Sequence, residues 1–186
     1  RLLASTDRVD NLNTNFKQAL NLGIYGCDLG YLNMYEKTGS VINNMTAIKT
    51  LANELRIGQF FDFNTIKRLA TNNENLDSLM YISVSSFNNM DEYLRQSNRS
   101  NISSLIVTGM WIEGMYLATQ VAKEAPQKNV VERVADQKLV LNDLILILKN
   151  YKGDPNFAEL VKDIESIKKE YESVKITYEM GEPEAK

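Results

Sequence analysis

The sequence predicts an all-α protein, an antiparallel bundle of six or seven helices joined by short loops. Apolar residues recur at intervals of three and four along nearly the whole chain, which is the period of an α-helix. No sustained alternation of apolar and polar residues, as a half-buried strand requires, is present. Hydrophobic residues make up 44% of the 186 positions, enough to build a buried core. We expect a single domain over residues 1–180 and a frayed tail over 181–186.

The N-terminal region is the least regular part of this pattern. Four apolar residues at helical spacing predict a first amphipathic helix: Val9, Leu12, Phe16 and Leu20. The closely spaced Gly23, Gly26 and Gly30 then predict either a break or a close helix crossing. A second short helix is expected over about 28–37.

Three longer helices are expected in the middle of the chain, over residues 40–57, 75–97 and 101–125. Gly58 is expected to end the first of them, and a short helix over 64–71 connects the first two. The third helix is apolar on two adjacent faces, so we expect it to lie in the interior.

Two more helices are expected near the C-terminus, over residues 127–150 and 155–178. Asp154 is suited to cap the second helix, and Pro155 to occupy its first position. Seven apolar side chains form one seam along this helix: Phe157, Leu160, Ile164, Ile167, Tyr171, Val174 and Tyr178. We expect the seam to dock within the bundle, although pairing with a second copy is an alternative.

An offset of 85 positions aligns three pairs of similar residues: Asp28 with Glu113, Tyr31 with Tyr116, and Leu32 with Leu117. The chain is therefore compatible with two pseudo-repeated three-helix units that share one core, the second beginning at the helix over 101–125. The alternative is that helical periodicity matches itself by chance.

Two carboxylates stand where helical spacing calls for apolar side chains. Glu113 lies between Met110 and Leu117 on an apolar stripe, and Asp28 lies in the apolar stretch 25–31. An unpaired buried carboxylate is costly, so each acid must be protonated, hydrogen-bonded or facing a cavity. If the repeat is real, the two acids could face each other.

The functional interpretation of these acids is a paired-carboxylate site for a small ligand or a hard cation. Its candidate residues are the two acids and the aromatic side chains near them: Asp28, Glu113, Tyr25, Tyr31, Trp111 and Tyr116. The structural alternative is that each acid is a satisfied hydrogen-bond partner that fixes the register of its helix.

Composition excludes several other classes of site. The chain has no His and a single Cys, which excludes a Cys/His zinc site and a His-dependent catalytic triad. Cys27 lacks an imidazole to activate it and is expected to be a small buried hydrophobe. The net charge is −3 with acids and bases interspersed, so we expect no nucleic-acid partner. We predict no catalytic residue, metal ligand or cofactor.

Three segments together resemble uncharacterised all-helical secreted proteins or lipoproteins of Bacteroidetes-type bacteria: residues 23–31, 72–79 and 109–116. The resemblance implies a location in the periplasm or cell envelope, with a lipid anchor upstream of Arg1; a cytoplasmic location is the alternative. It implies no activity. No apolar run in this chain is long enough to span a bilayer.

These observations lead to three hypotheses for function. The first is a non-enzymatic envelope module that binds an unknown small molecule or protein. The second is a helical protein, conceivably an enzyme, that binds a small molecule or cation at Asp28 and Glu113. The third is a structural homodimer formed through the helix over 157–178.

Overall fold

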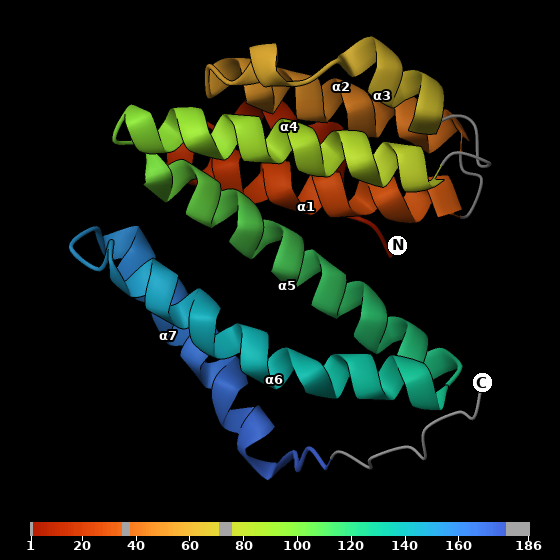
Figure 1. The fold of residues 1–186 in the computed structure, drawn as a ribbon, viewed down its shortest axis with the longest axis vertical. Helices are drawn as coiled ribbons and strands as arrows, with labels where there is room; N and C mark the ends of the chain where they lie inside the picture. Colours follow the sequence, from red (N-terminus) through yellow and green to blue (C-terminus); the bar gives the residue numbers. More distant parts are fainter. Residues whose placement is uncertain (1, 35–37, 71–75, 178–186) are drawn as a thin grey trace, which may run out of the picture. The chain divides into compact units, whose positions relative to one another are not determined.

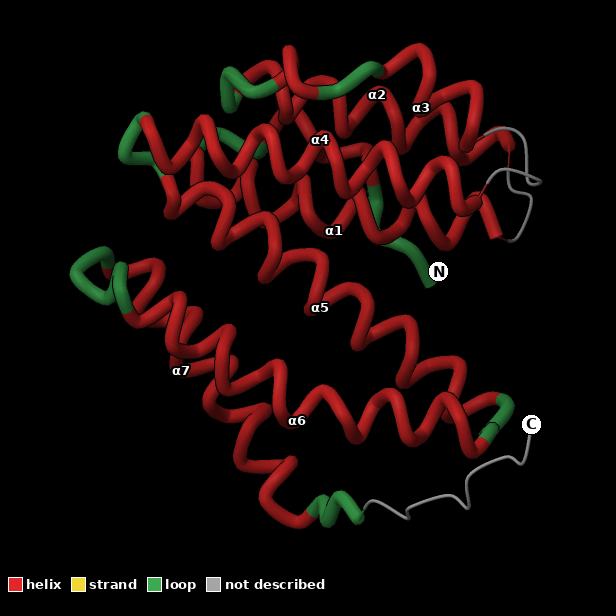
Figure 2. The backbone as a smooth tube through the Cα atoms, in the orientation of Figure 1, coloured by secondary structure: helices red, strands yellow, loops and turns green. Residues whose placement is uncertain are grey.

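The computed structural model describes residues 2–34, 38–70 and 76–177. Within these ranges the chain consists of helices joined by loops, without a strand (Figure 2), which confirms the all-α class. The chain divides into two compact units, Arg1–Leu117 and Ala118–Lys186, within the range for which one domain is predicted. The tail predicted over 181–186 lies outside the described residues. In the part of the chain that is described, no helix combines the length and the apolar character that crossing a membrane requires.

The first unit contains most of the helices (Figure 1). Its elements in chain order are η1 (Thr6–Asn11), α1 (Asn15–Met34), α2 (Thr38–Glu54), η2 (Gly58–Phe60), α3 (Phe63–Ala70), α4 (Leu76–Gln96) and the first part of α5 (Ser100–Glu124). Its core is built by fully buried side chains from α2, α4, α5 and the turn after α2: Leu51, Leu55, Ile57, Met90, Leu94, Ile102 and Leu105. These helices agree with the predicted ones except at the N-terminus and at the end of α2.

Helix α1 runs unbroken through all three of its clustered glycines, so the predicted break between two short helices is wrong. The expected first amphipathic helix is divided: Val9 lies in the short 3-10 helix η1 and Leu12 in the loop after it, whereas Phe16 and Leu20 belong to α1. Continuity is possible because glycine weakens a helix by only about 1 kcal/mol relative to alanine, which packing of the helix readily offsets.

The other predicted role of the glycines, a close helix crossing, is confirmed at Gly23. A Cβ atom on Gly23 would collide with the carbonyl oxygen of Ile106 in α5, and one on Gly109 would collide with the carbonyl oxygen of Leu20 in α1. The backbones of α1 and α5 therefore touch, and only a residue without a side chain fits at either position.

The crossing also fixes the relative direction and register of the two helices. One turn beyond it, a Cβ atom on Gly114 would lie 3.7 Å from the Sγ atom of Cys27. Residue numbers rise in the same direction along both helices at these contacts, so α1 and α5 are parallel. Consecutive helices of this unit, in contrast, run in opposite directions (Figure 1). In this register position 28 of α1 lies beside position 113 of α5.

The predicted internal repeat is not confirmed. The repeat places its second unit at the start of the helix over 101–125, whereas the boundary between the two compact units falls after Leu117, inside α5. Asp28 and Glu113 nonetheless occupy corresponding places on parallel helices, which is the part of the prediction on which the candidate site depends.

The end of α2 differs from the prediction because Arg56, not Gly58, reverses the chain. Helix α2 ends at Glu54, and Arg56 adopts a left-handed conformation with φ of 56°. The amide of Ile57 then donates to the carbonyl oxygen of Ala52 at 2.9 Å, which satisfies one of the carbonyl groups left open at the helix end. Gly58 begins η2 instead.

The second unit contains the end of α5, then α6 (Lys128–Lys149), α7 (Pro155–Glu170) and η4 (Tyr171–Ser173). Asp154 caps α7 as predicted, since its side chain accepts a hydrogen bond from the amide of Asn156 at 2.8 Å. The predicted extension of this helix to residue 178 is wrong. Beyond η4, Lys138 of α6 donates to the carbonyl oxygen of Val174 at 2.7 Å, and β-branched residues in this stretch disfavour further helix.

The apolar seam of α7 packs against α6 inside the second unit. Phe157, Leu160, Ile164 and Tyr171 are buried, and the hydroxyl of Tyr171 donates to the carbonyl oxygen of Val134 in α6 at 2.8 Å. Tyr178, the last residue of the predicted seam, lies outside the described residues. Because most of the described seam is covered by α6, little of it remains for a second copy of the chain.

The helix crossing generates a prediction about glycine substitutions. Gly23→Ala should lower the free energy of unfolding by about 1–3 kcal/mol, because the new methyl group meets backbone atoms that have to move. Gly26→Ala, three residues away where a Cβ atom meets open space, should raise it by about 0.5–1 kcal/mol. Chemical denaturation measures both values, and equal effects of the two substitutions would contradict the crossing.

Candidate functional site

The crossing of α1 and α5 brings Asp28 and Glu113 together in the interior of the first unit. Asp28 is 0% exposed and Glu113 is 8% exposed. Their carboxyl groups are close enough to form a hydrogen bond with each other. The two acids that the sequence marked on separate apolar stripes are therefore a buried pair.

Burial favours the protonated form of both acids. Burial first, then the negative charge of Glu113, raises the pKa of Asp28 to about 7, against a smaller lowering by the amide of Ala4. Burial also raises the pKa of Glu113, whereas the hydrogen bond from Asp28 lowers it. The two carboxyl groups are therefore coupled and titrate as a pair.

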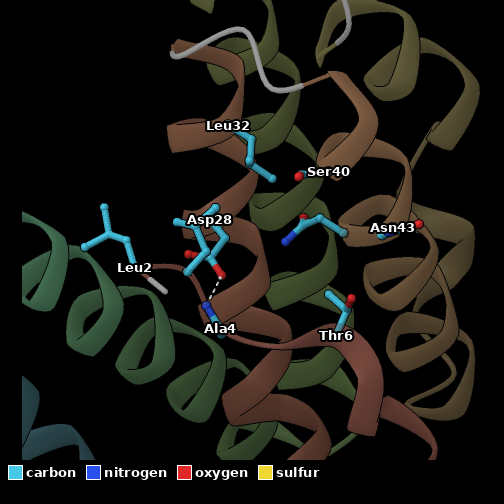
Figure 3. A pocket seen from close by; sticks show the side chains of 9 residues that line it. Leu2, Ala4, Thr6, Asp28, Leu32, Ser40 and Asn43 are labelled. Atoms are coloured by element: carbon cyan, nitrogen blue, oxygen red, sulfur yellow. Dashed lines mark hydrogen bonds between the residues drawn. The ribbon is translucent and has the colours of Figure 1, made fainter.

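The N-terminal segment covers Asp28 from the other side. The amide of Ala4 donates to Oδ2 of Asp28 at 3.1 Å (Figure 3), and the hydroxyl of Tyr25 donates to the carbonyl oxygen of Ser5 at 2.9 Å. Among the described residues no amide or hydroxyl group donates to Oδ1 of Asp28. Glu113 is the other polar group that interacts with the Asp28 carboxyl. Two hydrogen bonds to α1 thus hold residues 4 and 5 over the acid.

A cavity of about 210 Å³ adjoins Asp28. Residues of the N-terminal segment, α1 and the start of α2 line it (Figure 3): Leu2, Leu3, Ala4, Thr6, Asp28, Leu32, Ser40, Asn43 and Asn44. The exposed residues Ser40 and Asn43 form its solvent side. None of the described residues that line it carries a positive charge.

Asn44 is the second unusual polar group of this cavity. The residue is 3% exposed, and no donor among the described residues reaches its Oδ1 atom. A buried acceptor left without a partner costs about 1–3 kcal/mol, so a donor from a ligand or from water in the cavity would stabilise this arrangement.

The four aromatic candidates have different positions from those we expected. Tyr25 is buried and serves to hold the N-terminal segment. Tyr31 and Trp111 are half-buried, and Tyr116 is 42% exposed. The cavity beside Asp28 is lined by leucines, hydroxyl groups and amides instead of these aromatic rings.

Sequence reasoning missed the residues that α2 and the N-terminal segment contribute. One signal was present for Asn44, which follows Val41 by three positions and so stands beside the apolar stripe of α2. The N-terminal residues carried no such signal, because their contact with α1 joins positions 24 apart in the sequence.

Cys27 lies close to both acids. Burial, followed by the charges of Glu113 and Asp28, raises the pKa of the Cys27 thiol to about 11, so the thiol stays protonated and is a poor nucleophile. Cys27 is half-buried, not fully buried as expected. Among the described residues no three acidic or Cys side chains gather closely enough to hold a metal ion.

Comparison of the chain with protein-family models, with curated proteins and with solved structures finds no match in any of the three. The resemblance to envelope proteins therefore stays a prediction, and the site must be interpreted from its own geometry.

The raised pKa of Asp28 predicts how stability depends on pH. An aspartate has a pKa near 3.9 in an unfolded chain and Asp28 has one of about 7 in the fold, so the folded state holds the extra proton between these values. Stability should therefore fall as pH rises from 4 to 7, with a slope of at most about 1.4 kcal/mol per pH unit.

Asp28→Asn should abolish this fall and be more stable than the wild type at pH 8, measured by denaturation across the pH range. The exposed Asp143→Asn is the matched control and should follow the wild type. A wild-type profile as flat as that of Asp28→Asn would show that the acid is not protonated in the fold.

Proposed function

We propose that this chain is a non-enzymatic binding protein whose small ligand occupies the cavity beside Asp28. The observation that carries the proposal is the coincidence of a cavity, a fully buried acid and the unpartnered amide oxygen of Asn44 in one wall. Binding sites are concave, largely preformed, and orient a ligand by a few polar groups among apolar ones, and this cavity fits that description at small size.

Binding accounts for the site better than catalysis does. An acid with a pKa of about 7 is suited to general acid catalysis. However, Asp28 is coupled to Glu113, and its Oδ2 atom already accepts a hydrogen bond from the amide of Ala4. The thiol of Cys27, the preceding residue, has a raised pKa of about 11 and is a poor nucleophile.

We also propose an envelope location, periplasmic or lipid-anchored. Support for it comes from the resemblance of residues 23–31, 72–79 and 109–116 to secreted helical proteins. Cell fractionation of the full natural protein tests this location, and recovery in the cytoplasm alone would contradict it.

A thermal-shift screen tests the binding function. Amines, amino acids, polyols, carboxylates and simple salts are screened against the wild type, Asp28→Asn, Asn44→Leu and the control Asp143→Asn. A ligand present at about 100 times its Kd stabilises the folded state by about 2.7 kcal/mol, which is a shift of several degrees for a protein of this size.

We expect at least one compound to raise the Tm of the wild type and of Asp143→Asn but not of the two cavity variants. Shifts of equal size in all four proteins would place binding elsewhere. A complete lack of shifts in the wild type would contradict the binding function itself.

A further inference from the structure

We propose that the ligand is a small organic cation, with a primary ammonium head at Asp28 and Asn44 and a short hydrocarbon stem against the leucines of the cavity. This inference rests on the proposed binding function and names the chemical class that the cavity accepts.

The polar part of the cavity calls for hydrogen-bond donors and positive charge. Asn44 presents a buried oxygen without a donor, and Asp28 stands in the same wall with Glu113 behind it. A primary ammonium group carries three donors and one positive charge, which suits an unpaired acceptor and an acid together. An anion would meet the acid Asp28, and none of the described residues that line the cavity is basic.

The apolar part of the cavity calls for a hydrocarbon stem. Leu2, Leu3 and Leu32 line it, and a bare or hydrated metal ion would leave these side chains without apolar contacts. The volume of about 210 Å³ equals roughly seven water molecules at about 30 Å³ each, which suits a short aliphatic amine. A divalent ion such as Ca²⁺ requires six to eight oxygen ligands, and the described residues contain no cluster of three acidic or Cys side chains.

Binding of the cation exchanges it for a proton. The Asp28 carboxylic acid releases one proton to solvent and becomes the carboxylate that pairs with the ammonium group. The net charge of the site is unchanged, because the ligand brings one positive charge and the released proton removes one. Among the described residues, the titratable groups near Asp28 are Glu113 from α5 and Tyr25 and Cys27 from α1, and Asp7 of η1 faces Tyr25. The described residues of α2 and the N-terminal segment that line the cavity are uncharged.

Access to Asp28 requires the N-terminal segment to shift, since the acid is fully buried beneath it. The hydrogen bond from Tyr25 to Ser5 holds that segment in place. Tyr25→Phe removes this bond and should speed association of the ligand while leaving the pH dependence of binding intact.

Isothermal titration calorimetry with four matched probes tests the inference. The probe n-butylammonium has both head and stem, n-butanol has the stem without charge, butyrate has the opposite charge, and potassium has charge without stem. We expect n-butylammonium alone to bind, with an affinity about tenfold higher at pH 8 than at pH 6, because a group with a pKa of about 7 is one-tenth ionised at the lower pH. At pH 6, titrations in buffers of different ionisation enthalpy should show release of nearly one proton per ligand bound.

Two variants locate the binding. Asp28→Asn and Asn44→Leu should each weaken n-butylammonium binding by tenfold or more, and Asn44→Leu should also keep a wild-type fold because it replaces an unpartnered amide by an apolar group of similar size. The exposed Asp143→Asn should bind as the wild type does.

Other outcomes separate failure of this inference from failure of the binding function. Binding of n-butanol or butyrate that is lost in Asp28→Asn would overturn the cation class and retain the binding site. Binding of n-butylammonium that is unchanged in both cavity variants would overturn the cation site. Absence of binding by n-butylammonium likewise overturns the cation class, and the broader thermal-shift screen then decides the binding function.

Discussion

The contact between the backbones of α1 and α5 at Gly23 and Gly109 is the constraint on which the first unit depends. Two helices that touch at glycines leave no room for lateral adjustment, so their register is fixed to within a residue. That register sets Asp28 beside Glu113 one turn further on, in a place from which solvent is excluded. The site is therefore a consequence of how closely two helices approach.

A buried pair of acids is stable only if it carries one proton, since two negative charges in a medium of low polarity repel strongly. The fold compensates little for the burial of Asp28. Among the described residues, the backbone group that donates a hydrogen bond to Asp28 is the amide of Ala4. A structural pair with a purely architectural role would be closed by protein donors on every side. Here a cavity adjoins Asp28, and among the described residues no donor reaches the Oδ1 atom of Asn44, which is the basis of the binding proposal.

Helical periodicity was enough to predict the class and most helix ranges, because the apolar stripes of α2, α4, α5 and α6 are local features. Glu113 stood out for the same reason, as an acid on an apolar stripe. The continuity of α1 was not predictable, since it depends on the fit of Gly23 to Ile106, more than eighty positions away. The end of α7 was missed because Lys138 of α6 binds the carbonyl of Val174, and the cavity was missed because the N-terminal segment has no periodic pattern to mark it.

The site depends on the burial of Asp28 beside Glu113, which raises the pKa of the Asp28 carboxyl group far above its ordinary value. Direct titration of the side-chain carboxyl carbons by ¹³C NMR, assigned with Asp28→Asn, tests it without reference to any ligand. We expect the Asp28 signal to titrate near pH 7, well above the pKa of about 3.9 of an ordinary aspartate. An Asp28 signal that titrates near pH 4, with no change around neutrality, would contradict the raised pKa and the site built on it.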